Sequence, residues 1–309
     1  MKSNGKIGEN LFKSTKSVIL LAVLCTVLWG SAFPGVKMSY RYFHIESGDV
    51  STTMLLAGAR FFLAGVIALV VYFIYSKRII LPQKADIKGI ILTGIIQTGL
   101  QYFFFYIALS HLSGAKGAIL ATTITFFSVF LAHIMFQNDK VNVRKIMGCI
   151  VGFAGIIIIN LKNGGNLGKF SVLGDVFMLL STFSAALGAM ISKIVARKIN
   201  PVLVTGYQMM LGGAMLAIVG GASGGELSTD SINGVVLLIY LAFVSAIAFS
   251  IWTTLLKYNK PSNITIFNFA IPIFGTSLSA IFLHESIGGI QNIAALICVC
   301  LGIYIVNKK

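Results

Sequence analysis

Two glutamines inside one long apolar run have the type and spacing to bind a polar solute. Gln97 and Gln101 are four residues apart, so on a helix they share one face. Beside them lie Gly94, Thr98 and Tyr102. Each amide offers hydrogen-bond donors and acceptors. We predict that Gln97, Gln101 and Tyr102 line a substrate-binding cavity; the alternative is that these amides join one helix to another.

A second polar position stands further along the chain. Asn268 lies one helical turn before Pro272. An internal repeat, described below, places Thr122 opposite Asn268, with Thr125 close by. We predict that Asn268, Thr122 and Thr125 also line the cavity. Ser184, in another apolar run, is assigned to the same substrate-binding surface.

Aromatic pairs could supply a further part of that surface. Trp29 is near Phe33, and Phe249 is near Trp252. Such rings can stack on a flat or cationic ligand, although aromatic residues also fill cores and form belts at membrane interfaces. We include Trp29 and Trp252 among the predicted substrate-binding residues and leave the second interpretation open.

Two ionisable side chains also stand inside apolar runs. His133 could carry a proton, and a histidine satisfied within the protein core is the alternative. Arg60 comes eight residues after Thr52, about 12 Å along a helix axis at ~1.5 Å per residue. An arginine at that depth costs roughly 2.5–3.5 kcal/mol unless it is paired or solvated. We expect Arg60 to be satisfied by helix-end carbonyls or water and to support the structure rather than bind an anion.

The composition identifies the setting of these residues as a polytopic membrane protein. The 309 residues are 57% hydrophobic and 11% charged, whereas soluble domains carry about 25% charged residues. The mean hydropathy is +0.90. A membrane-crossing helix needs about 20 apolar residues. Ten such spans are predicted, at Val18–Tyr40, Thr52–Tyr75, Ile87–Ser110, Gly114–Phe136, Val143–Leu161, Leu173–Val195, Val202–Ala222, Ile232–Leu256, Ser262–Leu283 and Ile287–Val306.

The nine acidic residues all fall in loops, tails or at span ends. The mid-membrane carboxylate that usually relays protons or pairs with a cationic substrate is therefore missing from the sequence. A polyamine is disfavoured, and a neutral or zwitterionic metabolite such as an amino acid fits better. A quaternary amine or a nucleobase is kept as the alternative substrate class.

Enzymatic and metal chemistry have little support. The four histidines have no metal-ligand spacing, and no acid accompanies a nucleophile at membrane depth. The four cysteines lie in apolar runs and are interpreted as small core residues. We therefore expect no catalytic residue, no metal and no cofactor. A membrane scaffold is the non-transport alternative, but polar faces on several helices argue against it.

The distribution of Lys and Arg predicts the orientation. With the amino terminus in the cytoplasm, Arg60 lies within a span and most other basic residues face the cytoplasm. The outer segments then hold only Lys37, Arg41, Lys116, Lys162 and Lys169. The net charge of +15 is therefore a topology signal and does not indicate nucleic-acid binding. We expect a multi-pass protein of the cell membrane with both termini cytoplasmic, and either a monomer or a homodimer.

Displacing the chain by 146 residues aligns its two halves. Asp139 then meets Glu285 and Phe126 meets Pro272, without a gap over this stretch. Each half has five predicted spans, an odd number, so the second half enters the membrane from the opposite side. Inverted repeats of this kind are typical of transporters. We predict a cytoplasmic segment 1–17, a first repeat at 18–161 and a second, inverted repeat at 174–306.

Three segments resemble motifs of the EamA-type ten-helix drug/metabolite transporters. They are "VLWGSAFPGVK" from Val27, "AGARFFLAG" around Arg60 and "IPIFGTSLSAIFLHES" from Ile271. In the first half Asp139 replaces the usual Glu and Phe126 the usual Pro. The resemblance implies an all-α fold of ten transmembrane helices, arranged as two inverted five-helix repeats around a central cavity. It also implies that helices 1, 3, 4, 6, 8 and 9 line the path, and it favours export.

Pro34 and Pro272 are the prolines at membrane depth. A proline inside a helix removes one backbone hydrogen bond and clashes with the preceding turn. Both are flanked by small residues, which permit close helix approach. We predict that they are hinges of helices that rearrange between inward-open and outward-open states; a static kink is the alternative.

Overall fold

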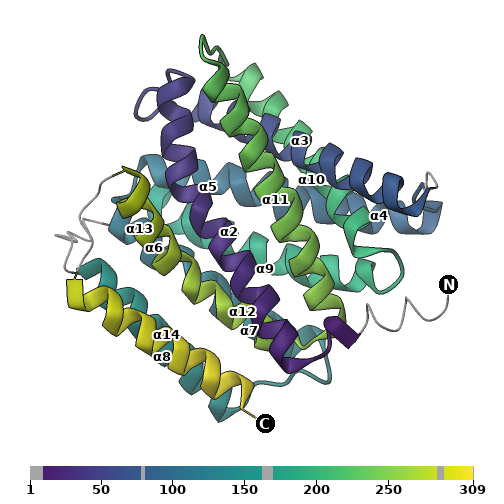
Figure 1. The fold of residues 1–309 in the computed structure, drawn as a ribbon, viewed down its shortest axis with the longest axis vertical. Helices are drawn as coiled ribbons and strands as arrows, with labels where there is room; N and C mark the ends of the chain where they lie inside the picture. Colours follow the sequence, from purple (N-terminus) through teal and green to yellow (C-terminus); the bar gives the residue numbers. More distant parts are fainter. Residues whose placement is uncertain (1–9, 78–80, 162–169, 284–288, 309) are drawn as a thin grey trace.

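The computed structural model describes residues 10–77, 81–161, 170–283 and 289–308. These residues form helices and connecting loops, with no strand among them (Figure 1). The first two long helices are α2 (Thr15–Tyr42) and α3 (Val50–Ser76). The third predicted span is one continuous run of α4 (Lys84–Thr93), a π-helical segment η1 (Gly94–Leu100) and α5 (Gln101–Ser110).

The remaining elements continue the same pattern of long helices joined by short loops. They are α6 (Gly114–Ala121), α7 (Thr123–Met135), α8 (Val143–Leu161), η2 (Val172–Val176), α9 (Phe177–Ala196), α10 (Pro201–Ala222), α11 (Ile232–Tyr258), α12 (Pro261–Thr265), η3 (Ile266–Phe269), α13 (Ala270–Leu283) and α14 (Gly289–Asn307).

By length and composition, eight helices in the described part of the chain could cross a membrane. They cover the first four predicted spans and the sixth to the ninth. Helices α8 and α14 occupy the fifth and tenth predicted spans but are not among these eight. The chain is therefore an all-helical, multi-pass membrane protein.

Helices α3 and α10 lie in close, antiparallel contact. A Cβ atom on Gly58 would lie 2.3 Å from the backbone nitrogen of Ala217, and one on Gly65 would lie 2.5 Å from the backbone oxygen of Gly206. Side chains larger than hydrogen do not fit at these two positions, because the neighbouring atoms are backbone. Small residues bring helices together in lipid, where no hydrophobic effect favours their association.

A second antiparallel pair is formed by α8 and α14. Gly148 approaches the backbone of Gly302, and Gly155 approaches that of Ala295. In Figure 1 this pair lies at one edge of the molecule, in agreement with the peripheral position expected for these two helices. The remaining contacts join α2 to α11 and α13, and α9 to α5 and α7.

Loops far apart in sequence meet at the end of the bundle that holds both chain termini. Asn259 Nδ2 donates a hydrogen bond to the backbone oxygen of Phe12 (2.8 Å), and Arg144 donates one to that of Lys308 (3.1 Å). At the opposite end, the backbone N–H of Glu226 donates to Thr52 Oγ1 (3.2 Å). The described parts of both termini therefore lie on one side of the molecule.

Asp139 joins two of the loops at the terminal end. Its carboxylate is fully buried, pairs with the ammonium of Lys145 and accepts hydrogen bonds from the backbone N–H (2.9 Å) and hydroxyl of Ser262. The α7–α8 connection is thereby fixed to the first turn of α12. Glu285, which the repeat aligns with Asp139, lies outside the described residues.

The fourth and ninth predicted spans are both interrupted. Between α12 and α13 the backbone passes through the 3₁₀ turn η3, just before Pro272. Between α6 and α7 the break is at Thr122, although no proline follows it. There the hydroxyls of Thr122 and Thr123 bond back to the carbonyls of Ile119 and Leu120 (both 2.6 Å). Such side-chain bonds compete with the helical backbone pattern. By contrast, α2 continues as one helix through Pro34.

Candidate functional site

The π-helical segment η1 positions Gln97 between neighbouring helices. A Cβ atom on Gly188 of α9 would lie 2.4 Å from the Cβ of Gln97, so the two helices touch at this point. The Gln97 side chain is buried, and its Oε1 has no hydrogen-bond partner among the described residues. π-helical segments are rare and frequent at functional sites. A buried amide oxygen without a partner is costly unless a ligand or water completes it.

Gln101 and Ser184 belong to the same helix-to-helix interface. Ser181 of α9 donates a hydrogen bond to the backbone oxygen of Gln101 (2.8 Å). Ser184 and Gly188 are four residues apart and share the face of α9 that meets η1 and α5. Ser184 is buried and Gln101 is half-buried. The structure therefore brings three predicted substrate residues, Gln97, Gln101 and Ser184, to one interface.

A second polar group lies where the interrupted helices meet. Thr125 Oγ1 of α7 donates a hydrogen bond to the backbone oxygen of Thr265 (3.3 Å), at the end of α12. Asn268 is buried in the following 3₁₀ turn, and Thr122 is buried at the break between α6 and α7. The predicted proximity of the Thr122–Thr125 segment to the Asn268 segment is thus found.

The two polar groups pack against different helices. Segment η1 is in contact mainly with α9 and α10, and η3 mainly with α7, α8 and α14. Gln97 and Asn268 are both buried rather than facing lipid. Their convergence on one cavity stays a prediction, and in this structure both surfaces are packed closed.

Aromatic side chains join α2 to α11 and α3 to α5. The Trp29 ring meets Phe249 and Trp252 edge-on, at centroid distances of 5.2 and 5.0 Å. Tyr102 lies 4.3 Å from Phe61, centroid to centroid. The two tryptophans predicted from sequence are therefore in direct contact with each other. A wall of this kind suits the apolar part of a solute, and it is equally a tightly packed core.

His133 lies near the end of α7, facing the α7–α8 loop. Its Nδ1 accepts a hydrogen bond from the backbone N–H of Val141 (3.1 Å), and its backbone oxygen accepts one from Lys140 (2.9 Å). An imidazole that accepts at Nδ1 is neutral, with its proton on Nε2. This placement gives His133 a structural contact; a role in proton coupling stays a prediction.

Arg60 is buried and donates from Nε to the hydroxyl of Ser245 on α11 (3.0 Å). The expected helix-end carbonyls are not its partners in the described structure. Ser245 is 185 positions away in sequence, so no local pattern could have paired the two residues.

Sequence reasoning missed a polar cluster between α9, α10 and α11. Gln208 Oε1 accepts a hydrogen bond from Thr98 (2.7 Å), and Thr205 donates to Thr253 (3.2 Å), which lies 3.5 Å from the hydroxyl of Ser192. Gln208 is a single amide inside an apolar span, which is the signal that identified Gln97. The same criterion could have found it.

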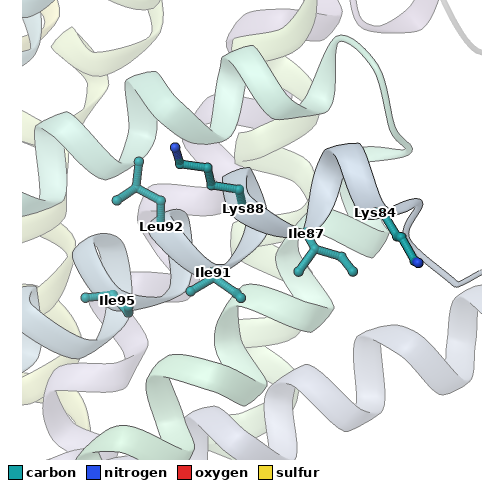
Figure 2. Close-up of a pocket in the computed structure, with 6 residues that line it drawn as sticks. All are labelled: Lys84, Ile87, Lys88, Ile91, Leu92 and Ile95. Atoms are coloured by element: carbon teal, nitrogen blue, oxygen red, sulfur yellow. The ribbon is translucent and has the colours of Figure 1, made fainter.

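An open groove runs along α4, on the surface of the molecule. Figure 2 shows its lining, Lys84, Ile87, Lys88, Ile91, Leu92 and Ile95. The four apolar side chains are between 39% and 43% exposed. Ammonium groups at one end of an apolar helix face are typical of a helix that faces lipid, with lysines at the headgroup level. The groove includes none of the predicted substrate residues.

Among the described residues, no group of His, Cys, Asp and Glu side chains could hold a metal ion. The described site offers amides, hydroxyls and aromatic rings. These groups bind and orient a solute and provide no nucleophile paired with a base.

Comparison with known proteins agrees with this arrangement. The chain is 26% identical over 306 residues to the "Uncharacterized transporter YvbV" of Bacillus subtilis (strain 168), covering 96% of this chain and 92% of that protein. It is 22% identical over 300 residues to the "Probable amino-acid metabolite efflux pump" of Escherichia coli (strain K12), covering 93% of each. A solved crystal structure, described only as that of a protein, matches with a TM-score of 0.79 at 16% identity, covering 95% of this chain and 97% of its own. At that identity the likeness shows the fold alone.

A family model matches the chain twice, over residues 16–161 and 172–308. The two matches together cover nearly all of the sequence, and the names of the relatives indicate a transporter rather than an enzyme. The chain belongs to the EamA-like transporter family.

Proposed function

We propose that this transporter moves a small neutral or zwitterionic, amino-acid-like metabolite across the cell membrane by alternating access, as an exporter or exchanger. The observation that carries the proposal is Gln97, whose buried amide oxygen has no partner in the described structure and lies in a π-helical segment. Amides and hydroxyls suit a solute of low net charge. The name of the Escherichia coli relative, an amino-acid metabolite efflux pump, supports the same substrate class.

The proposed architecture is ten transmembrane helices in two inverted repeats around a central cavity. Two features support it. The helices that the repeat pairs with each other, α3 with α10 and α8 with α14, run antiparallel in contact. The contacts of α2 with α11 and α13 are matched by those of α9 with α5 and α7, as a two-fold relation between the halves requires.

In the proposed cycle, the solute contacts Gln97, Gln101 and Ser184 on one side of the cavity and Thr122, Thr125 and Asn268 on the other. Tyr102, Trp29 and Trp252 form its aromatic wall. Because these surfaces are closed in the structure, the helices must separate for binding. The breaks at Thr122 and η3, together with Pro34 and Pro272, are the proposed positions of bending.

The contact between Trp29, Phe249 and Trp252 favours a second substrate class, quaternary amines, because aromatic faces attract cations. A thermal-shift screen separates the classes. The purified protein is heated with individual amino acids, nucleobases or quaternary amines, and the melting temperature is recorded. A ligand at 100 times its dissociation constant adds about 2.7 kcal/mol of stability. We expect stabilisation by amino acids; stabilisation by quaternary amines alone would replace the first proposal with the second.

A further inference from the structure

Arg60 is a buried cation whose charge is not matched by an acid in the described structure. The residue is 7% exposed, and Nε donates to Ser245. Among the described residues Arg60 makes no ion pair and no second hydrogen bond. Its guanidinium has five N–H donors, and the ring of Phe61 lies 5.0 Å from it, centroid to Cζ. One hydroxyl and one ring are a small compensation for burying a full charge.

Other buried cations of this protein are better satisfied. Lys145 pairs with the carboxylate of Asp139, and the ammonium of Lys193 donates to the backbone oxygens of Leu256 and Asn259. Arg60 therefore differs from residues whose burial is explained by protein partners. The difference indicates that another group completes the environment of Arg60 during the transport cycle.

The guanidinium lines a narrow pocket with other polar side chains. Ser39 and Tyr40 come from α2, Thr53 from α3 and Tyr106 from α5, and the rest of the wall is apolar. The pocket has a volume of about 10 Å³, which is room for about one water molecule. It is therefore polar but closed to anything larger in this conformation.

The elements that form the pocket place it away from the end that holds the chain termini. Tyr40 is in the last turn of α2 and Thr53 is in the first turn of α3. On the inner side, Phe61 is in contact with Tyr102. Gln101 precedes Tyr106 by five residues on α5, about 7.5 Å along the axis at ~1.5 Å per residue. A solute of amino-acid size can therefore reach from Arg60 to the aromatic and amide residues of the proposed site.

We propose that the Arg60 pocket is a carboxylate subsite, which binds the acid group of the transported solute when α2 and α11 separate. This inference rests on the proposed function and narrows its substrate class to monocarboxylates, with zwitterionic amino acids among them. A guanidinium matches a carboxylate with two parallel N–H···O bonds, and the hydroxyl of Tyr106 is placed to donate a further one. The role expected from the sequence, structural support alone, is thereby replaced.

The test compares acids with their amides. Thermal shifts give the affinity of the wild-type protein for leucine, phenylalanine, leucinamide and phenylalaninamide. We expect the acids to bind at least about tenfold more tightly, because a hydrogen bond to a charged group is worth about that factor. Arg60→Gln should abolish the preference, and Arg60→Lys should retain part of it. Arg41→Gln, which changes an exposed arginine of α2, is the matched control and should behave as wild type.

Equal affinity of the wild-type protein for acids and amides, or no binding of either acid, would overturn the subsite, whatever the variants do. A preference for acids that survives in Arg60→Gln would overturn it too. If Arg60→Gln does not fold, Tyr106→Phe should weaken binding of the acids severalfold and leave the amides unchanged; an equal effect on both contradicts the proposal. Counterflow into proteoliposomes separates the two proposals. Transport without an acid preference contradicts only the subsite, and acid binding without any counterflow contradicts only the transport function.

Discussion

Two buried glutamines in neighbouring helices provide a residue-scale test of the proposed site. Gln97 Oε1 has no partner in the described structure, whereas Gln208 Oε1 accepts from Thr98. An unsatisfied buried carbonyl costs about 1–3 kcal/mol. Replacing Gln97 by Met, of similar volume, should therefore preserve or raise the melting temperature. The same variant should bind an amino acid roughly tenfold more weakly, since one ligand hydrogen bond is worth about 0.5–1.5 kcal/mol.

Gln208→Met is the matched control. It leaves the buried hydroxyl of Thr98 without its acceptor, so it should lower stability by about 1–3 kcal/mol and change affinity little. Both quantities are measured on each purified variant. If Gln97→Met destabilises the protein and binds its ligand normally, the amide joins helices and does not contact the solute.

His133 provides a second test at this scale. Gln can accept from Val141 N–H as His133 Nδ1 does, so His133→Gln should fold and support substrate counterflow, losing at most its pH dependence. His133→Ala leaves that N–H without an acceptor and should lower the melting temperature. Loss of counterflow in folded His133→Gln would mean that the imidazole contacts the solute.

At the residue scale, the sequence identified single polar side chains but not their partners. Gln97, Gln101 and Asn268 stand out because amides are rare in apolar spans. The bond from Arg60 to Ser245 joins α3 to α11, and that from Thr125 to Thr265 joins α7 to α12. Such pairs depend on how helices pack, which residue type and spacing within one helix do not determine.

At the element scale, the two interrupted helices show where a motif was informative and where it was silent. Pro272 predicted a bend in the ninth span, and the 3₁₀ turn η3 lies just before it. The matching break at Thr122 has no proline signal, because threonine hydroxyls bond back to the preceding turn. The π-helical segment η1 was also not predicted. There Gly188 and Gly212 let α9 and α10 press against Gln97 and Thr98.

The Asp139 network should be the main link between the α7–α8 and α11–α12 connections. Asp139→Asn leaves the ammonium of Lys145 buried without its carboxylate, so it should destabilise the protein by about 3–5 kcal/mol. Adding Lys145→Met removes the uncompensated charge and should recover most of that loss. Melting temperatures of both variants give the comparison. A single variant as stable as wild type would show that the pair is solvated rather than buried.

At the scale of the whole molecule, hydropathy located the membrane-crossing helices well. The first predicted span, Val18–Tyr40, corresponds to α2 at Thr15–Tyr42, because a fixed bilayer thickness requires a long apolar run whatever the packing. The closed state of the polar surfaces was not predictable, since several conformations of a transporter share one sequence.

The orientation can be tested with two single cysteines in a background without the native ones. Ser228 lies between α10 and α11, and Lys84 is the first residue of α4. The basic residues place Ser228 outside and Lys84 inside. Ser228→Cys in whole cells should react with an impermeant thiol reagent, and Lys84→Cys should react only after the membrane is opened. The reverse pattern would contradict the orientation and the inverted-repeat arrangement together.

The central claim is that this EamA-family protein carries amino-acid-like solutes, and counterflow tests it most directly. Proteoliposomes containing the purified protein are loaded with an unlabelled amino-acid mixture and diluted into radiolabelled amino acids. We expect labelled amino acid to enter transiently above its equilibrium level, with much slower entry for Gln97→Met. Protein-free liposomes set the background. No counterflow of any amino acid by folded, inserted protein, with counterflow of a quaternary amine or nucleobase in the same vesicles, would contradict the account.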